Sequence, residues 1–138
     1  MVEIDAIYEG RLRCRVTHGP SGMVLTTDAP TDHHGQGAAF SPTDLVAAAL
    51  SSCLLTVMGI VAQRHGLDLI GTRVHVTKEM VDTPIRRIGT LAVTVTFSVC
   101  FDESQRMLLE RTARSCPVHH SLHPDLHAPI TFVYPASL

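Results

Sequence analysis

No run of basic residues occurs anywhere in this chain, and its charges nearly cancel. Eleven lysines and arginines stand against thirteen aspartates and glutamates, which gives a net charge of −2 with neutral histidines. Neither a nucleic acid nor an anionic membrane is therefore expected as a partner, and the substrate is expected to be small. The N-terminal residues also lack the basic and then apolar pattern of a signal peptide, since they carry Glu3 and Asp5.

Cysteines are few and widely spaced. The four lie at positions 14, 53, 100 and 116, and no two form a Cys-x-x-Cys pair. This spacing lacks the density of a secreted disulfide scaffold and favours a reducing compartment, so we expect a cytoplasmic protein. With 138 residues, 45% of them hydrophobic, the chain is expected to form one domain over residues 1–138 with its own core.

One long uncharged segment runs from Leu45 to Ala62. Its 18 residues barely reach the length of a transmembrane helix, and polar or small residues recur along it every three or four positions. A membrane span would not need that stripe, so we expect a mostly buried helix with one face at a cleft or a subunit boundary. The stripe consists of Asp44, Ala48, Ser52, Thr56, Gly59 and Gln63.

Hydrophobic periodicity and turn residues predict an α+β order of elements, with no βαβ repetition and no internal repeat. The long helix is expected to begin at Ser41-Pro42, as N-cap and first helical residue, and to end at His65-Gly66. The other expected elements are a three-stranded meander from Glu3 to Thr27, a loop from Asp28 to Phe40, a hairpin of Leu67 to Val81 with Ile88 to Phe101, a helix from Glu103 to Arg114 capped by Asp102, a helical turn from Cys116 to Leu122 and a strand from Ile130 to Tyr134.

Two of the cysteines, Cys53 and Cys116, occupy positions that favour thiol redox chemistry. Cys53 lies midway along the long apolar helix, and Cys116 directly precedes Pro117, which fits the first position of a short helix. We expect the helix N-terminus to make the Cys116 thiol ionise more easily. Both cysteines would form a reversible redox pair if the fold brings them together, whereas Cys14 and Cys100 are expected to be structural.

These residues resemble the OsmC/Ohr family of thiol-dependent hydroperoxide reductases, and the expected element order matches along nearly the whole chain. The resemblance implies an antiparallel sheet with a long central helix in an intertwined homodimer. The motifs that carry it are Ser41-Pro42-Thr43-Asp44-Leu45, Ala47-Ala48-Ala49-Leu50-Ser51-Ser52-Cys53 and Cys116-Pro117-Val118-His119.

The resemblance also implies a peroxidase of organic hydroperoxides that acts in antioxidant defence without a cofactor. Cys53 would attack the peroxide and become a sulfenic acid, and Cys116 would resolve it as a disulfide. A dithiol, for some relatives a lipoylated protein, would then reduce the pair. Asp44 is the third candidate catalytic residue, as the acid nearest to the family motif.

Two departures from the family pattern keep a rival open. Family peroxidases place a glutamate directly after the motif proline, where this chain has Thr43, and an arginine in the first hairpin turn, which here runs from His18 to Gly22. A non-enzymatic binder of an apolar or thiol ligand on the same scaffold is therefore the alternative.

Asp44 is nine residues from Cys53, about 13 Å along a helix, so it would support a cysteine only across a dimer interface; a plain helix cap explains it equally well. A second rival is a metal protein built on the histidines near Cys116, although Pro124 interrupts any helix between His123 and His127, and no metal is expected.

Overall fold

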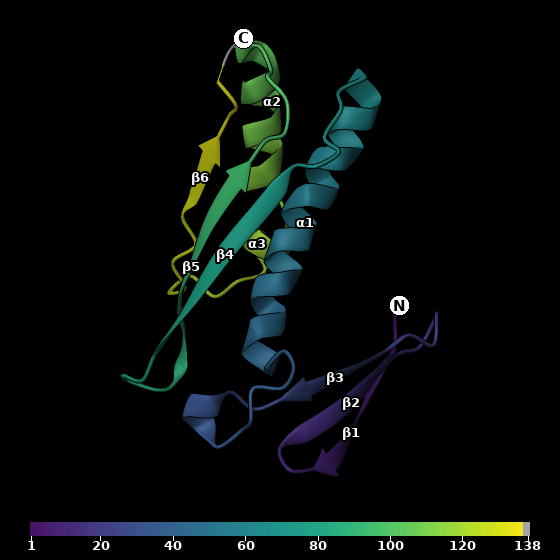
Figure 1. Ribbon diagram of the computed structural model, residues 1–138, viewed down its shortest axis with the longest axis vertical. Coiled ribbons are helices and arrows are strands. Elements are labelled where there is room, and N and C mark those ends of the chain that lie inside the picture. The colour runs from purple at the N-terminus through teal and green to yellow at the C-terminus, as the bar shows by residue number, and fades with distance from the viewer. Residues whose placement is uncertain (137–138) are drawn as a thin grey trace. The chain divides into compact units, whose positions relative to one another are not determined.

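The computed structural model describes residues 1–136, whose contacts form two compact units, Met1–Val46 and Ala47–Leu138 (Figure 1). Each unit contains one three-stranded sheet. The chain is thus α+β, as expected, although the strands form two sheets instead of one. The single domain over residues 1–138 stays a prediction, and the units are described one at a time.

The first unit is the expected meander, with strands β1 (Ile4–Gly10), β2 (Arg13–His18) and β3 (Val24–Asp28) paired antiparallel in that order. Each of the two turns contains a glycine that the sequence predicts there, Gly10 in the first and Gly22 in the second. Their φ values are 87° and 73°, which glycine adopts at little cost. The following loop contains one short 3₁₀ turn, η1 (Thr31–His33).

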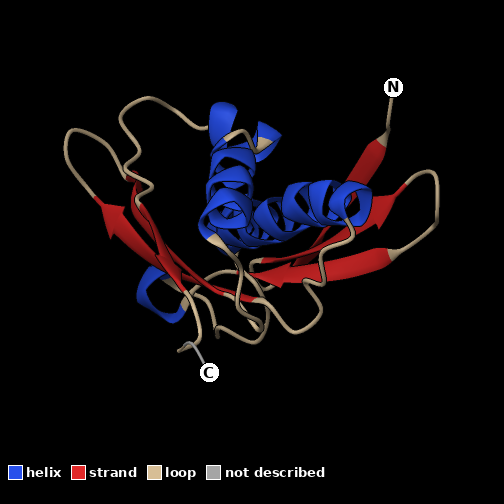
Figure 2. Ribbon diagram, turned by 90° about the horizontal axis from the view of Figure 1, so that it is seen from above, coloured by secondary structure: helices blue, strands red, loops and turns tan. Residues whose placement is uncertain are grey.

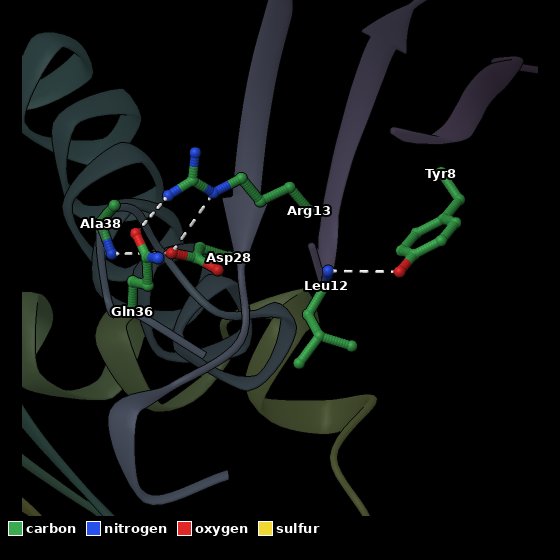
Figure 3. Close-up of polar contacts among 6 residues, drawn as sticks. All are labelled: Tyr8, Leu12, Arg13, Asp28, Gln36 and Ala38. Carbon is green, nitrogen blue, oxygen red and sulfur yellow. Dashed lines mark hydrogen bonds and ion pairs between the residues drawn. The ribbon is translucent and has the colours of Figure 1, made fainter. Parts of the chain in front are cut away.

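A buried ion pair fastens this loop to the end of the sheet (Figure 3). Arg13 and Asp28 are paired across β2 and β3, and the Arg13 Nε lies 3.7 Å from Asp28 Oδ2. The Ala38 backbone N–H donates to the same carboxylate at 3.0 Å, and Arg13 donates to Gln36 at 2.9 Å. Asp28 is only 1% exposed, so these partners take the place of water at its Oδ2 atom.

Helix α1 (Pro42–His65) begins and ends where the sequence predicts. The Ser41 hydroxyl accepts a hydrogen bond from the Asp44 backbone N–H at 3.1 Å, and the Ser41 N–H donates to Asp44 Oδ2 at 2.9 Å. These reciprocal bonds satisfy donors that a helix start otherwise leaves open. Gly66, with φ of 66°, ends the helix.

The second sheet has the order β4-β5-β6, with β4 (Arg73–Val81), β5 (Arg87–Thr96) and β6 (Ile130–Val133). The hairpin of β4 and β5 is antiparallel, but β6 pairs parallel to β5, so the expectation of a purely antiparallel sheet was wrong here. The helices between β5 and β6 return the chain to the end where β5 begins, which permits parallel pairing.

Strand β4 also begins six residues later than expected. A turn occupies the intervening residues, because the Ile70 N–H donates to Asp68 Oδ1 at 2.9 Å and the Thr72 N–H donates to the Leu69 carbonyl at 2.9 Å. Gly71 has φ of 87° within this turn. The Asp68 side chain thus bonds to the local backbone and favours a turn, so that β4 begins only at Arg73.

Helices cover one face of the second sheet, as Figure 2 shows for the long ones. Alternate β5 residues, Leu91, Val93 and Val95, are almost fully buried, as is Phe97 just after the strand, all at 2% exposure or less. The facing positions of α1 recur every four residues, as expected for one stripe of a helix. They are Leu50, Leu54, Met58 and Ala62, also at 2% or less.

The remaining helices are α2 (Glu103–Arg114) and the single turn α3 (Pro117–His120). Asp102 caps α2 as predicted, in a capping box with Gln105 whose two hydrogen bonds measure 2.8 and 3.0 Å. Leu109 and Ala113 of α2 are fully buried, and α3 follows directly, so this packing determines where the chain places Cys116.

Candidate functional site

The structure brings Cys53 and Cys116 together. Cys53 is half-buried on α1 between the fully buried Leu50 and Leu54, and Cys116 is the fully buried N-cap of α3. The two side chains share a hydrogen bond, and both cysteines are free thiols. A pair at this range can exchange a proton and can form a disulfide after a modest movement.

Cys116 does not ionise more easily, which corrects the expectation from the sequence. Burial raises the pKa of the Cys116 thiol above 9.0, and the hydrogen bond to Cys53 raises it further. The backbone N–H groups of His119 and Val118 in α3 lower this pKa, as a helix start should, but their effect is smaller. Cys116 therefore keeps its proton at neutral pH and is the donor to Cys53.

Asp44 lies at the start of α1, where one carboxylate oxygen accepts the Ser41 N–H. The structure thus gives Asp44 a capping role. Nine residues of helix separate it from Cys53, so the two side chains are not neighbours along α1. A catalytic role for Asp44 stays a prediction.

Three hydroxyls of α1, two of them in the polar stripe, bond to the helix itself. Ser51 and Ser52 donate to the Ala48 carbonyl, each at 2.9 Å, and Thr56 donates to the Ser52 carbonyl at 2.8 Å. Hydroxyls bonded in this way present little polarity to a neighbour, so this side of the helix is suited to close packing.

Within residues 1–136, no group of three or more histidine, cysteine, aspartate or glutamate side chains could hold a metal ion. The His119 and His120 rings contact each other edge to face, and His123 lies 3.9 Å from Asp125.

Sequence reasoning overlooked two charged residues that the fold places inward. Asp28 of the ion pair described above is one, and Lys78 on β4 is the other. Lys78 pairs with the fully buried Leu91, between the half-buried Val76 and Met80. The sequence does contain a signal for Lys78. Apolar residues alternate with polar ones along this strand, and Lys78 falls at a position where the alternation expects an apolar residue.

Comparison with known proteins identifies the fold and the family. The model of the OsmC-like protein family matches residues 34–129, more than half of the chain. A protein of Psychrobacter arcticus named for osmotic stress induction and a detoxification response is 39% identical, with a TM-score of 0.90 and 96% of each chain covered. The chain therefore belongs to the OsmC-like family, which confirms the resemblance seen in the sequence.

More distant structures share this fold. An organic hydroperoxide resistance protein of Legionella pneumophila has a TM-score of 0.78 at 18% identity, with 96% of each chain covered. One of Vibrio cholerae, with captopril bound in one of its active sites, has a TM-score of 0.76 at 18% identity, with 96% of this chain and 90% of that chain covered. No curated protein matches this chain.

Proposed function

We propose that this protein is a cysteine-based peroxidase that reduces organic hydroperoxides through Cys53 and Cys116. The observation that carries the proposal is the hydrogen-bonded contact of the two reduced thiols, one half-buried and one fully buried. The family and its hydroperoxide resistance members support the same chemistry. Defence against oxidative stress is the corresponding role.

Cys53 is the attacking residue because it is the more accessible thiol of the pair. Its thiolate attacks one oxygen of the hydroperoxide, the O–O bond breaks, and the alkoxide leaves and takes up a proton as an alcohol. Cys53 is then a sulfenic acid.

Cys116 is suited to the second step. Its sulfur attacks the sulfenic sulfur, the thiol proton leaves with the hydroxide as water, and a disulfide forms. A dithiol then reduces this disulfide by exchange and becomes a disulfide itself. The balanced reaction converts one hydroperoxide and one dithiol into one alcohol, one water and one disulfide. We propose a dithiol, with a lipoylated protein as the candidate, as the reductant, and the cytoplasm as the compartment.

A homodimer is part of this proposal because a single chain leaves apolar surface uncovered. Helix α1 is long and apolar enough to cross a bilayer, with mean hydropathy of 2.3, and only 22% of its apolar window is buried. Core helices of water-soluble proteins pass the same test of length and composition. The self-bonded hydroxyls on α1 favour a protein neighbour, and we propose that a second copy covers this helix.

The first sheet carries a second uncovered apolar surface. Cross-strand partners point to the same face of a sheet. We call the face of the first sheet that carries Ile4 and Tyr8 the apolar face. Ile4 and Tyr8 on it are 64% and 63% exposed, and a groove of about 250 Å³ lies beside Ile4, Val16 and Leu25. The opposite face carries Asp5 and Glu9 together with Arg15. The apolar face consists of Ile4, Ala6, Tyr8, Cys14, Val16 and Leu25, with the polar His18 and Thr27 at its ends.

Asp44 belongs to the proposal as an acid that acts across the dimer. Asp44→Ala and Cys53→Ser subunits, each inactive as a homodimer, should form mixed dimers in which one site has an intact Asp44 and an intact Cys53. Recovery of activity on mixing supports this role. Activity no higher than in the unmixed inactive homodimers argues that Asp44 is a helix cap alone.

Steady-state turnover of cumene hydroperoxide with dihydrolipoamide tests the main proposal. We expect rapid dithiol oxidation that Cys53→Ser abolishes. The matched control is Cys100→Ser, which removes an exposed thiol that bonds to the carbonyls of Pro135 and Ala136 and should leave the rate unchanged. Background rates with every hydroperoxide and dithiol would instead support the ligand-binding rival, which the replacement of the family glutamate by Thr43 favours.

A further inference from the structure

The two sulfur atoms of the candidate pair differ in their access to solvent. Cys116 has 0% of its surface exposed, whereas Cys53 is half-buried on α1. A single chain already buries Cys116, and a second copy only covers further surface, so Cys116 stays buried in any assembly that keeps this fold. Cys53, by contrast, has to remain reachable in the proposed function, because its sulfur must meet the hydroperoxide.

Access decides which sulfur of a disulfide a reductant attacks. The attacking thiolate approaches along the line of the S–S bond, from the side opposite to the sulfur that leaves. An attack on Cys53 starts at its half-buried side chain and expels Cys116. An attack on Cys116 would have to start inside the protein, since no part of that residue meets solvent. The opening that admits the hydroperoxide therefore also admits the reductant, and it leads to Cys53.

The start of α3 suits Cys116 to the role of leaving group. Cys116 is the N-cap of α3, where the backbone N–H groups of Val118 and His119 favour its thiolate. Burial outweighs these N–H groups and raises the pKa of the Cys116 thiol, so the sulfur takes up a proton once it has left. The developing charge is thus stabilised while the S–S bond breaks and is neutralised afterwards.

We propose that the reductant attacks the sulfur of Cys53 and that Cys116 is the leaving group of the disulfide. This inference rests on the peroxidase function proposed above. One thiolate of the dithiol forms a mixed disulfide with Cys53, and Cys116 departs and takes up the proton that the second thiol loses. The second thiolate then attacks the reductant's own sulfur in the mixed disulfide. The reductant closes to a cyclic disulfide, and Cys53 leaves as a thiolate.

A monothiol cannot close such a ring. Its mixed disulfide with Cys53 lies beside the freed Cys116 thiol, which attacks Cys53 and expels the monothiol again. The mixed disulfide with a monothiol is therefore short-lived in the wild-type protein, but it records which sulfur was attacked first.

Trapping with glutathione tests the inference. The full-length protein is oxidised with diamide, which needs no peroxide, then freed of the oxidant and mixed with glutathione. Acid stops the exchange at early times, N-ethylmaleimide labels the free thiols, and mass spectrometry of the unreduced peptides locates the glutathione. We expect about tenfold or more adduct on Cys53 than on Cys116, with the Cys116 thiol free. An adduct on Cys116 as large as that on Cys53 would overturn the inference.

Oxidised glutathione supplies a second measurement, now from the reduced protein. In Cys116→Ser no neighbouring thiol remains, so glutathione should stay on Cys53, whereas the wild-type protein should expel it and form the intramolecular disulfide. The matched control is Cys100→Ser, which removes an exposed thiol and should behave as wild type. Loss of glutathione from Cys116→Ser as fast as from wild type would contradict the role of Cys116.

The two proposals fail separately. If glutathione is found on Cys53 but no hydroperoxide is turned over, the function is wrong and the assignment of the leaving group holds. If hydroperoxide is turned over and glutathione is found on Cys116, this inference alone is wrong. If diamide gives no disulfide between the two cysteines, both are wrong.

Discussion

The thiol of Cys116 donates a hydrogen bond to the side chain of Cys53, although 63 positions of the chain separate the two residues. The buried stripe of α1 holds one partner, and the packing of α2 and α3 holds the other. Two rigid elements therefore bring the thiols together without a mobile loop.

The first prediction concerns the order of the two thiols in the reaction. Cys116→Ser should still react with one equivalent of hydroperoxide at Cys53, but the sulfenic acid should persist because nothing resolves it. Trapping with dimedone and mass spectrometry of the Cys53 peptide measures this product. In Cys53→Ser no dimedone adduct should form at Cys116; an adduct there would reverse the assigned roles.

The second prediction concerns stability at alkaline pH. Burial raises the pKa of Cys116 in the folded protein, so the folded chain holds this proton more tightly than the unfolded chain does. The contribution to the free energy of unfolding is fully present below pH 9.0 and is lost as the pH rises through the folded-state pKa.

Urea denaturation of the reduced protein at pH 7, 9 and 10 measures this loss. Cys116→Ser should show a smaller decrease between pH 9 and 10, whereas Cys100→Ser should retain the wild-type decrease. A decrease of equal size in wild type and Cys116→Ser would contradict the assignment.

The third prediction concerns the ion pair of the first unit. Removing Asp28 leaves the half-buried Arg13 without its carboxylate and the Ala38 N–H without its acceptor. Asp28→Ala should therefore lower the free energy of unfolding by about 1–3 kcal/mol. Chemical denaturation measures this change.

The exposed pair of Arg15 and Glu9, 4.0 Å apart, is the matched control for that measurement. Solvent screens this pair, so Glu9→Gln should change stability by no more than about 1 kcal/mol. A cost for Asp28→Ala as small as that would show that the buried pair does not hold the loop.

The fourth prediction concerns the proposed dimer. Ile4 and Ile7 lie on the same strand with similar exposure, 64% and 55%, but on opposite faces of the sheet. Ile4→Asp should shift the protein toward the monomer because it places a charge in the proposed interface, whereas Ile7→Asp should not. Sedimentation measures both, and a wild-type monomer or equal effects of the two changes would contradict the proposal.

Local signals in the sequence predicted most of the secondary structure. Ser41, Pro42 and Gly66 predicted both ends of α1, and Asp102 predicted the start of α2, because caps act on neighbouring backbone groups. Family motifs likewise predicted the meeting of Cys53 and Cys116.

What the sequence did not reveal depends on burial and on contacts between distant residues. The parallel pairing of β6 with β5 depends on where α2 returns the chain. The pKa of Cys116 reverses the simple helix-end argument because burial outweighs two backbone donors, and burial is known only once the core is assembled. The pairing of Arg13 with Asp28 likewise requires the register of β2 and β3.

One titration tests the central claim most directly. The reduced protein is treated with increasing cumene hydroperoxide up to one equivalent per chain, and its cysteine peptides are mapped by mass spectrometry without reduction. We predict one intramolecular disulfide between Cys53 and Cys116, formed in proportion to the peroxide, with Cys14 and Cys100 unmodified. Both cysteines still reduced after one equivalent, or oxidation spread over all four, would contradict the account.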